Sequence, residues 1–111
     1  FGVLNEIDQK SFVFQNFVAN RLFEKNQNTP NTVHFWRTVD RAEVDFVINQ
    51  GNSILPIEVK YSNFKKPQLT RSFRSFLEKY SPKEAWVVNL DLEEELEVKK
   101  TKVKFIPYYK I

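Results

Sequence analysis

The sequence has 111 residues, of which 41% are apolar and 28% charged, and its formal net charge is +3. This length suits one hydrophobic core but not two ordinary domains, so we expect a single domain over residues 1–111. The lack of cysteine excludes disulfides and thiol chemistry and favours the cytoplasm. No stretch approaches the roughly 20 apolar residues of a membrane span, so we expect no membrane contact. The start at Phe1 rather than methionine predicts a fragment of a longer protein.

The first predicted element is an amphipathic helix over residues 8–25, with Asp8 as its N-cap. The loop-forming residues 26–32, which include Pro30, end this helix. The apolar side chains that define its buried face are Val13, Phe14, Phe17, Val18 and Leu22.

Three extended segments follow, at residues 34–39, 43–49 and 53–60. Gly51 can adopt a positive φ, which predicts a hairpin between the second and third segments. In the second segment, two-residue alternation places three apolar side chains on one face, namely Val44, Phe46 and Ile48.

A second amphipathic helix is predicted over residues 67–80, and a buried strand over residues 84–90. Residues 91–102 change from acidic to basic and predict a solvated turn or an edge hairpin. Residues 103–111 then predict a last edge strand that Pro107 interrupts. The order helix, three strands, helix, strand predicts an α/β sandwich with a mixed central sheet and an extra C-terminal edge strand. The second helix should return as a right-handed crossover between parallel strands.

Four charges occupy the two most apolar segments, at Glu43, Asp45, Glu58 and Lys60. Side chains two apart in a strand point the same way, so two carboxylates and an ammonium can converge. Buried charges must pair, bind a metal or reach water. Carboxylates with water suit Mg²⁺, which would polarise a phosphodiester, with Lys60 nearby to orient water or offset charge. The alternative is a structural ion-pair network around Lys60.

The chain places an acidic residue, a hairpin and then E-x-K within the order α-β-β-β-α-β. This arrangement resembles the PD-(D/E)XK superfamily, which has the restriction-endonuclease-like fold. A narrower resemblance is carried by FVFQNFVANRL, HFWRTVDRAEVDFVI and ILPIEVKYS. These segments are similar to the C-terminal domain of unknown function found in many prokaryotic AAA-type ATPases. The resemblance covers about residues 10–80. It implies a nuclease-like module that acts on DNA, joined to an N-terminal ATPase domain.

The superfamily pattern implies that Asp45, Glu58 and the carbonyl of Val59 bind Mg²⁺ or Mn²⁺ and that Lys60 is the catalytic lysine. The first helix of the family usually carries a glutamate that points at the metal, and this chain has Gln15 there. Gln15 lies at the margin of the buried helical face and can reach the site as a neutral amide. Glu43 could partly replace the missing charge, or the metal could bind more weakly.

Four basic residues begin or line the second helix, and they either bind a DNA backbone or form only a solvated face. They are Lys65, Lys66, Arg71 and Arg74. The acidic residues 91–97 should lie away from any DNA-binding face. His34 is expected to be an ordinary strand residue, Trp36 a core residue, and Arg37 a partner of the acidic cluster, with contact to phosphate as the alternative.

Two functional hypotheses remain, a Mg²⁺-dependent DNA phosphodiesterase and a catalytically silent module that docks the ATPase on DNA or on a protein. A third, nucleotide hydrolysis by this segment, is excluded because its only glycines are Gly2 and Gly51 and no phosphate-binding loop can form. ATP would therefore bind only in the missing part of the parent protein. The oligomeric state stays open, and an oligomer is compatible with the sequence.

Overall fold

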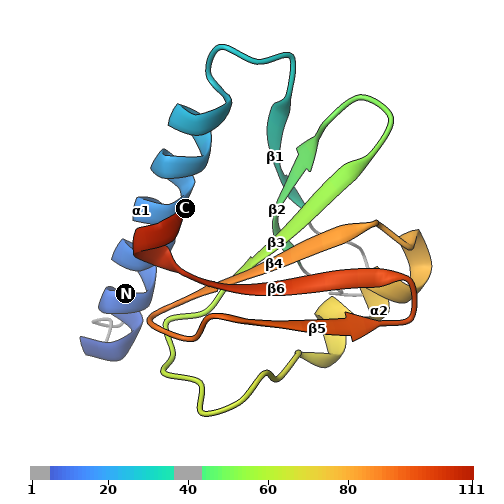
Figure 1. The fold of residues 1–111 in the computed structure, drawn as a ribbon. Helices are drawn as coiled ribbons and strands as arrows, with labels where there is room; N and C mark the ends of the chain where they lie inside the picture. Colours follow the sequence, from blue (N-terminus) through green and yellow to red (C-terminus); the bar gives the residue numbers. More distant parts are fainter. Residues whose placement is uncertain (1–5, 37–43) are drawn as a thin grey trace.

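The structure, a computed structural model, describes the backbone of residues 6–36 and 44–111 and the side chains of residues 9–35 and 44–111. A six-stranded mixed sheet separates the two long helices, with α1 on one face and α2 on the other (Figure 1). The strand order is β1-β2-β3-β4-β6-β5. In chain order the elements are α1 (Glu6–Asn26), β1 (Thr32–Trp36), β2 (Val44–Asn49), β3 (Ile54–Val59), α2 (Arg71–Tyr80), β4 (Glu84–Asn89), β5 (Glu94–Val98), β6 (Thr101–Pro107) and the 3-10 helix η1 (Tyr108–Lys110).

The predicted mixed α/β architecture is confirmed at the level of the sheet and the two helices. The predicted parallel pair is also confirmed, because β3 and β4 pair parallel, with Glu58 opposite Val87. Gly51 lies between β2 and β3 with φ +89°, as the predicted hairpin requires. The right-handed crossover and the restriction-endonuclease-like topology remain predictions.

Helix α1 covers one face of the sheet through Phe14, Val18 and Leu22, which pack on apolar side chains of β2, β3 and β4. Full burial of one such side chain contributes about 1.5–3 kcal/mol. Val13 and Phe17 were predicted on the same buried face, and this was wrong because both side chains are exposed. They lie on the flank of α1 that faces Tyr61 and Tyr108 rather than the sheet.

Helix α2 packs Phe73, Phe76 and Leu77 on the opposite face. It begins later than the predicted Pro67, because Thr70 is extended, with φ −68° and ψ 156°, and its hydroxyl accepts the N–H of Phe73 at 3.1 Å. This N-cap fixes the start of the helix next to the end of β3. Neither long helix, nor any other helix in the described part of the chain, is long and apolar enough to cross a membrane.

The predicted C-terminal edge strand is wrong in its position. β6 pairs parallel with β4 and antiparallel with β5, so it lies inside the sheet, and the acidic segment forms the edge. Pro107 is tolerated because it is the last residue of β6, opposite Asn89 at the end of the ladder. The exposed glutamates of β5 instead supply the charge that protects an edge strand.

Candidate functional site

A β-bulge places Asp45 at the point where β2 and β3 part. The partner of Phe35 is Phe46 but the partner of Trp36 is Val44, so Asp45 is an extra residue in β2. The prediction that Val44, Phe46 and Ile48 share one face is therefore wrong for Val44, which packs on the α2 side while the other two pack on the α1 side.

Both oxygens of the Asp45 carboxylate accept hydrogen bonds. The main-chain N–H of Val59 donates to Oδ2 at 2.7 Å, and the side-chain amide of Gln15 donates to Oδ1 at 2.9 Å. The β2–β3 ladder stops at the pair Phe46 and Ile57, so the side chain of Asp45 satisfies an N–H that no longer has a strand partner. Gln15 therefore reaches Asp45 as a neutral amide, as its place at the margin of the helical face predicted.

Glu58 is the most unusual carboxylate of the site because it is only 6% exposed. Burial raises its pKa above the ordinary value. The ammonium of Lys60 and the hydroxyl of Thr70 partly offset that rise, and the charge of Asp45 adds to it. Thr70 Oγ1 donates to Oε1 of Glu58 at 3.0 Å. A carboxylate with a raised pKa at the end of a strand is typical of functional sites, although structural networks also produce it.

Lys60 follows β3 directly, and its main-chain N–H continues the ladder by donating to Val88 at 2.8 Å. Its Nζ lies 3.5 Å from Oε1 of Glu58, and its side chain is partly exposed. Glu58 and Lys60 therefore lie together, as the two-residue spacing predicted. The ammonium can reach both the buried carboxylate and a solvent-borne ligand.

The predicted third metal ligand, the carbonyl of Val59, lies on the same strand edge as its N–H, since both groups of a residue point the same way in a β-ladder. That N–H is bound to Asp45, so the carbonyl faces the same gap between β2 and β3. The structure thus brings Gln15, Asp45 and Val59 together at one end of the sheet, with Glu58 and Lys60 beside them.

The predicted DNA-contacting residues lie on the α2 side of this end. Lys65 and Lys66 are exposed in the loop after β3, and Arg71 and Arg74 are exposed on the first two turns of α2. The loop between β3 and α2 carries the two lysines (Figure 1), and Arg71 follows Thr70, whose hydroxyl contacts Glu58.

Some predicted neighbours fall outside the described residues, namely Glu43, Arg37 and the side chain of Trp36. His34 is described and lies exposed on β1, where its Nε2 is 2.7 Å from the hydroxyl of Thr32. It does not contact the carboxylates. Its role as an ordinary strand residue agrees with this position.

Sequence reasoning missed Thr70, which joins α2 to Glu58. Its hydroxyl accepts the N–H of Phe73 as the N-cap of α2 and at the same time donates to the carboxylate of Glu58. A threonine three residues before Phe73, the first buried residue of the α2 stripe, was the available signal for an N-cap.

A comparison with protein-family models matches residues 10–111 to a domain of unknown function, DUF4143. The chain belongs to the DUF4143 family. The comparison with curated proteins found no match. Membership of DUF4143 confirms the expectation of a domain of unknown function and assigns no activity.

The DUF4143 chain fits a divalent cation by the chemistry of its donors. Asp45 and Glu58 offer carboxylate oxygens and Val59 a carbonyl, which are hard ligands that Mg²⁺ and Mn²⁺ accept. Within residues 9–35 and 44–111, no three histidine, aspartate or glutamate side chains form a metal-binding group. A cation held only by two carboxylates and one carbonyl would keep several waters, and Mg²⁺ is reluctant to lose its waters.

Proposed function

We propose that this end of the sheet is a Mg²⁺- or Mn²⁺-dependent site for phosphodiester hydrolysis in DNA, in a restriction-endonuclease-like domain. The observation that supports it is the bulge that fixes Asp45 close enough to the buried Glu58 for its charge to raise the pKa of Glu58, with Lys60 beside Glu58. Such a carboxylate pair is costly without a ligand, because burial already disfavours the charge of Glu58. A cation would relieve that cost.

In this proposal Asp45, Glu58 and the Val59 carbonyl hold the cation. When bound, the cation would polarise the phosphoryl oxygen and lower the pKa of a coordinated water. Lys60 stabilises the negative charge that develops on the phosphoryl oxygens as water adds to phosphorus and the bond to the leaving alcohol breaks. Gln15 keeps Asp45 in place through its amide.

The wider assembly is part of the same proposal. The domain would be tethered to an ATPase domain of a longer cytoplasmic protein, and that domain would bind ATP. Lys65, Lys66, Arg71 and Arg74 would hold the DNA backbone by charge. Their exposure supports this role, as does the contact of Thr70 with Glu58 directly before Arg71.

A catalytically silent docking module is the second candidate. The amide of Gln15 already satisfies one oxygen of Asp45, where a glutamate would have repelled that carboxylate and favoured a cation. In this case Glu58 and Lys60 form a structural ion pair, and the domain positions the ATPase on DNA or on a protein.

Calorimetry decides between the two. Mn²⁺ and Mg²⁺ are titrated into the parent chain, into Asp45→Asn and Glu58→Gln, and into Glu94→Gln, which removes an exposed carboxylate of β5. We expect heat of binding for the parent and Glu94→Gln and none for the site variants.

Plasmid nicking is then measured for the chains that bind metal. Lys60→Met is expected to bind metal but not to nick the plasmid. No binding by the parent in the millimolar range would leave the docking module as the function.

A further inference from the structure

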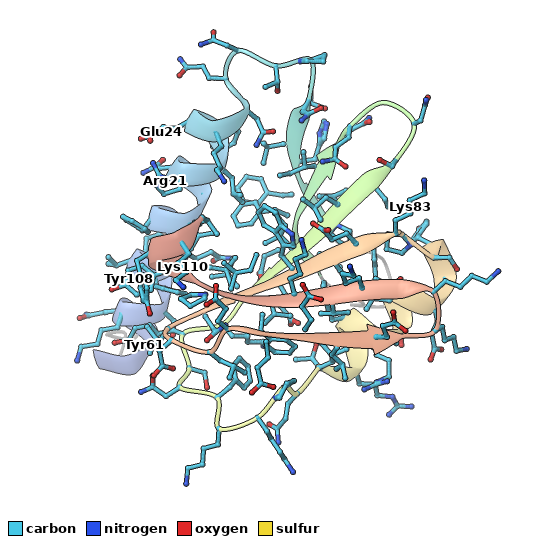
Figure 2. The ribbon with its side chains drawn as sticks, viewed as in Figure 1. Arg21, Glu24, Tyr61, Lys83, Tyr108 and Lys110 are labelled. Atoms are coloured by element: carbon cyan, nitrogen blue, oxygen red, sulfur yellow. The ribbon has the colours of Figure 1, made fainter. Side chains whose placement is uncertain are left out.

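A pocket of about 620 Å³ lies between the N-terminal half of α1 and the ends of β3, β4 and β6. Figure 2 shows two of its residues, Tyr61 and Tyr108, beside α1. Gln9 and Lys10 supply the polar part of its wall. The apolar residues that line it are Val13, Phe14, Phe17, Tyr61, Leu90 and Tyr108.

The aromatic rings of this pocket hold one another at fixed angles. Phe14 meets Tyr61 edge-on at a centroid distance of 5.5 Å and Tyr108 at 5.4 Å, and Phe17 meets Tyr108 at 5.8 Å. Phe17 is nevertheless 45% exposed and Tyr61 39% exposed. Rings that are fixed by their neighbours yet open to solvent can stack on a planar ligand at low entropic cost.

The pocket shares two chain segments with the carboxylate site. Tyr61 follows Lys60 directly, so their Cα atoms are about 3.8 Å apart. Phe14 precedes Gln15, whose amide binds Asp45. The carboxyl ends of parallel strands, where this pocket opens, are also where ligands bind in open α/β sheets.

We propose that this pocket takes an unpaired base of the DNA strand whose phosphodiester lies at Asp45 and Glu58, which rests on the proposed function. The bases of an intact duplex are stacked on each other and cannot enter an aromatic pocket without being flipped out. The substrate class is therefore DNA with an unpaired nucleotide beside the cleaved bond, such as a single strand, a frayed end or a flap. Gln9 and Lys10, which line the same pocket, would offer polar groups to the edge of the base.

Fluorescence anisotropy tests this with a labelled single-stranded oligonucleotide and a blunt duplex of the same sequence. EDTA is present, so no hydrolysis occurs and the metal site does not contribute. Two pocket variants, Phe17→Leu and Tyr61→Leu, keep apolar volume but remove the rings. Each has a matched control, since Phe23 is 48% exposed on the same helix and Tyr80 is 39% exposed on α2. The controls are Phe23→Leu and Tyr80→Leu, and thermal melts check that all four fold.

We expect each pocket variant to bind the single strand about tenfold more weakly, since it loses one base–aromatic stack. The controls should bind like the parent, and duplex binding should change less than twofold for all. Equal affinity for both oligonucleotides, or equal binding by the parent and both pocket variants, overturns the proposal. If light scattering shows that the pocket variants differ from the parent in oligomeric mass while their oligonucleotide binding is unchanged, the pocket is instead a contact between protein chains.

Failure here is distinct from failure of the proposed function. The calorimetric titration reports on the metal site, whereas the difference in anisotropy between the pocket variants and their matched controls in EDTA reports on the pocket. Metal binding without a preference for the single strand would contradict the proposed base pocket but support the proposed hydrolytic site. The reverse result would leave a single-strand-binding module with no metal chemistry.

Discussion

Glutamates lie both at the end of β3 and along the edge strand β5, in very different surroundings. Glu58 is buried, and burial raises its pKa, whereas Glu94, Glu95 and Glu97 are exposed. The two groups are separated by β4 and β6 in the sheet. At the edge, water solvates the charge and the charge discourages strand pairing. At the end of β3 the same charge is stabilised by Lys60 and Thr70 in place of water.

The largest effect on stability should come from Asp45→Ala. The change leaves the N–H of Val59 and the amide of Gln15 without their acceptor, and each unsatisfied group costs about 1–3 kcal/mol. We expect a loss of about 2–4 kcal/mol in the free energy of unfolding, measured by urea titration. Asp45→Asn keeps one acceptor oxygen and should lose about half as much. A loss within about 0.5 kcal/mol for Asp45→Ala would mean that the bulge holds without its carboxylate.

Thr70→Val should have the next largest effect, since it removes both the N-cap of α2 and a donor to Glu58. Loss of a threonine cap costs about 1–2 kcal/mol. The same change should raise the pKa of Glu58 further, because the hydroxyl of Thr70 stabilises the ionised form. Chemical denaturation measures the first effect and NMR titration of the carboxyl carbon the second. Thr70→Ser keeps the hydroxyl and should resemble the parent in both; equal pKa values in Thr70→Val and the parent would contradict this role.

Glu58→Gln tests the contrast between the buried Glu58 and the exposed glutamates of β5 through the pH dependence of the free energy of unfolding. The native pKa of Glu58 is raised, so the folded chain binds this proton more tightly than the unfolded chain. The free energy of unfolding therefore falls as pH rises from the ordinary value of 4.5 to the raised value. Glu58→Gln does not lose stability in this pH range. It should therefore be more stable than the parent at neutral pH, but not below pH 4.5. Thermal melts across that range measure the difference. A difference that does not grow with pH would show that Glu58 is not strained by burial.

Glu94→Ala provides the smallest expected effect. Its side chain is exposed on the edge strand, so the free energy of unfolding should change by no more than about 0.5 kcal/mol. Urea titration beside the parent measures it. A larger loss would mean that the acidic edge contributes to folding as well as to solubility, and the contrast with β3 would weaken.

The sequence predicted the parts of this fold that depend on local pattern. The strand within residues 53–60, the hairpin at Gly51 and the two-residue spacing of Glu58 and Lys60 all follow from neighbours along the chain. The contact of Gln15 with Asp45 spans 30 residues, and it was expected from the position of Gln15 at the margin of the helical face.

The remaining features depend on pairing that local pattern does not encode. A two-residue period cannot show where an extra residue enters a strand, so the bulge at Asp45 and the reversed face of Val44 were missed. The position of β6 depends on whether the acidic segment pairs outside it. Pro107 suggested an edge, yet a proline at the last residue of a strand removes no ladder bond that the strand needs.

The bond from Val59 to Asp45 also makes one amide of the chain report on the site. Hydrogen exchange at Val59 requires its N–H to leave the carboxylate, so any ligand that draws Asp45 away should speed exchange at this single amide while its neighbours in β3 stay protected. Binding of a ligand at the site would then be measurable by NMR hydrogen exchange, without an attached fluorophore and without turnover.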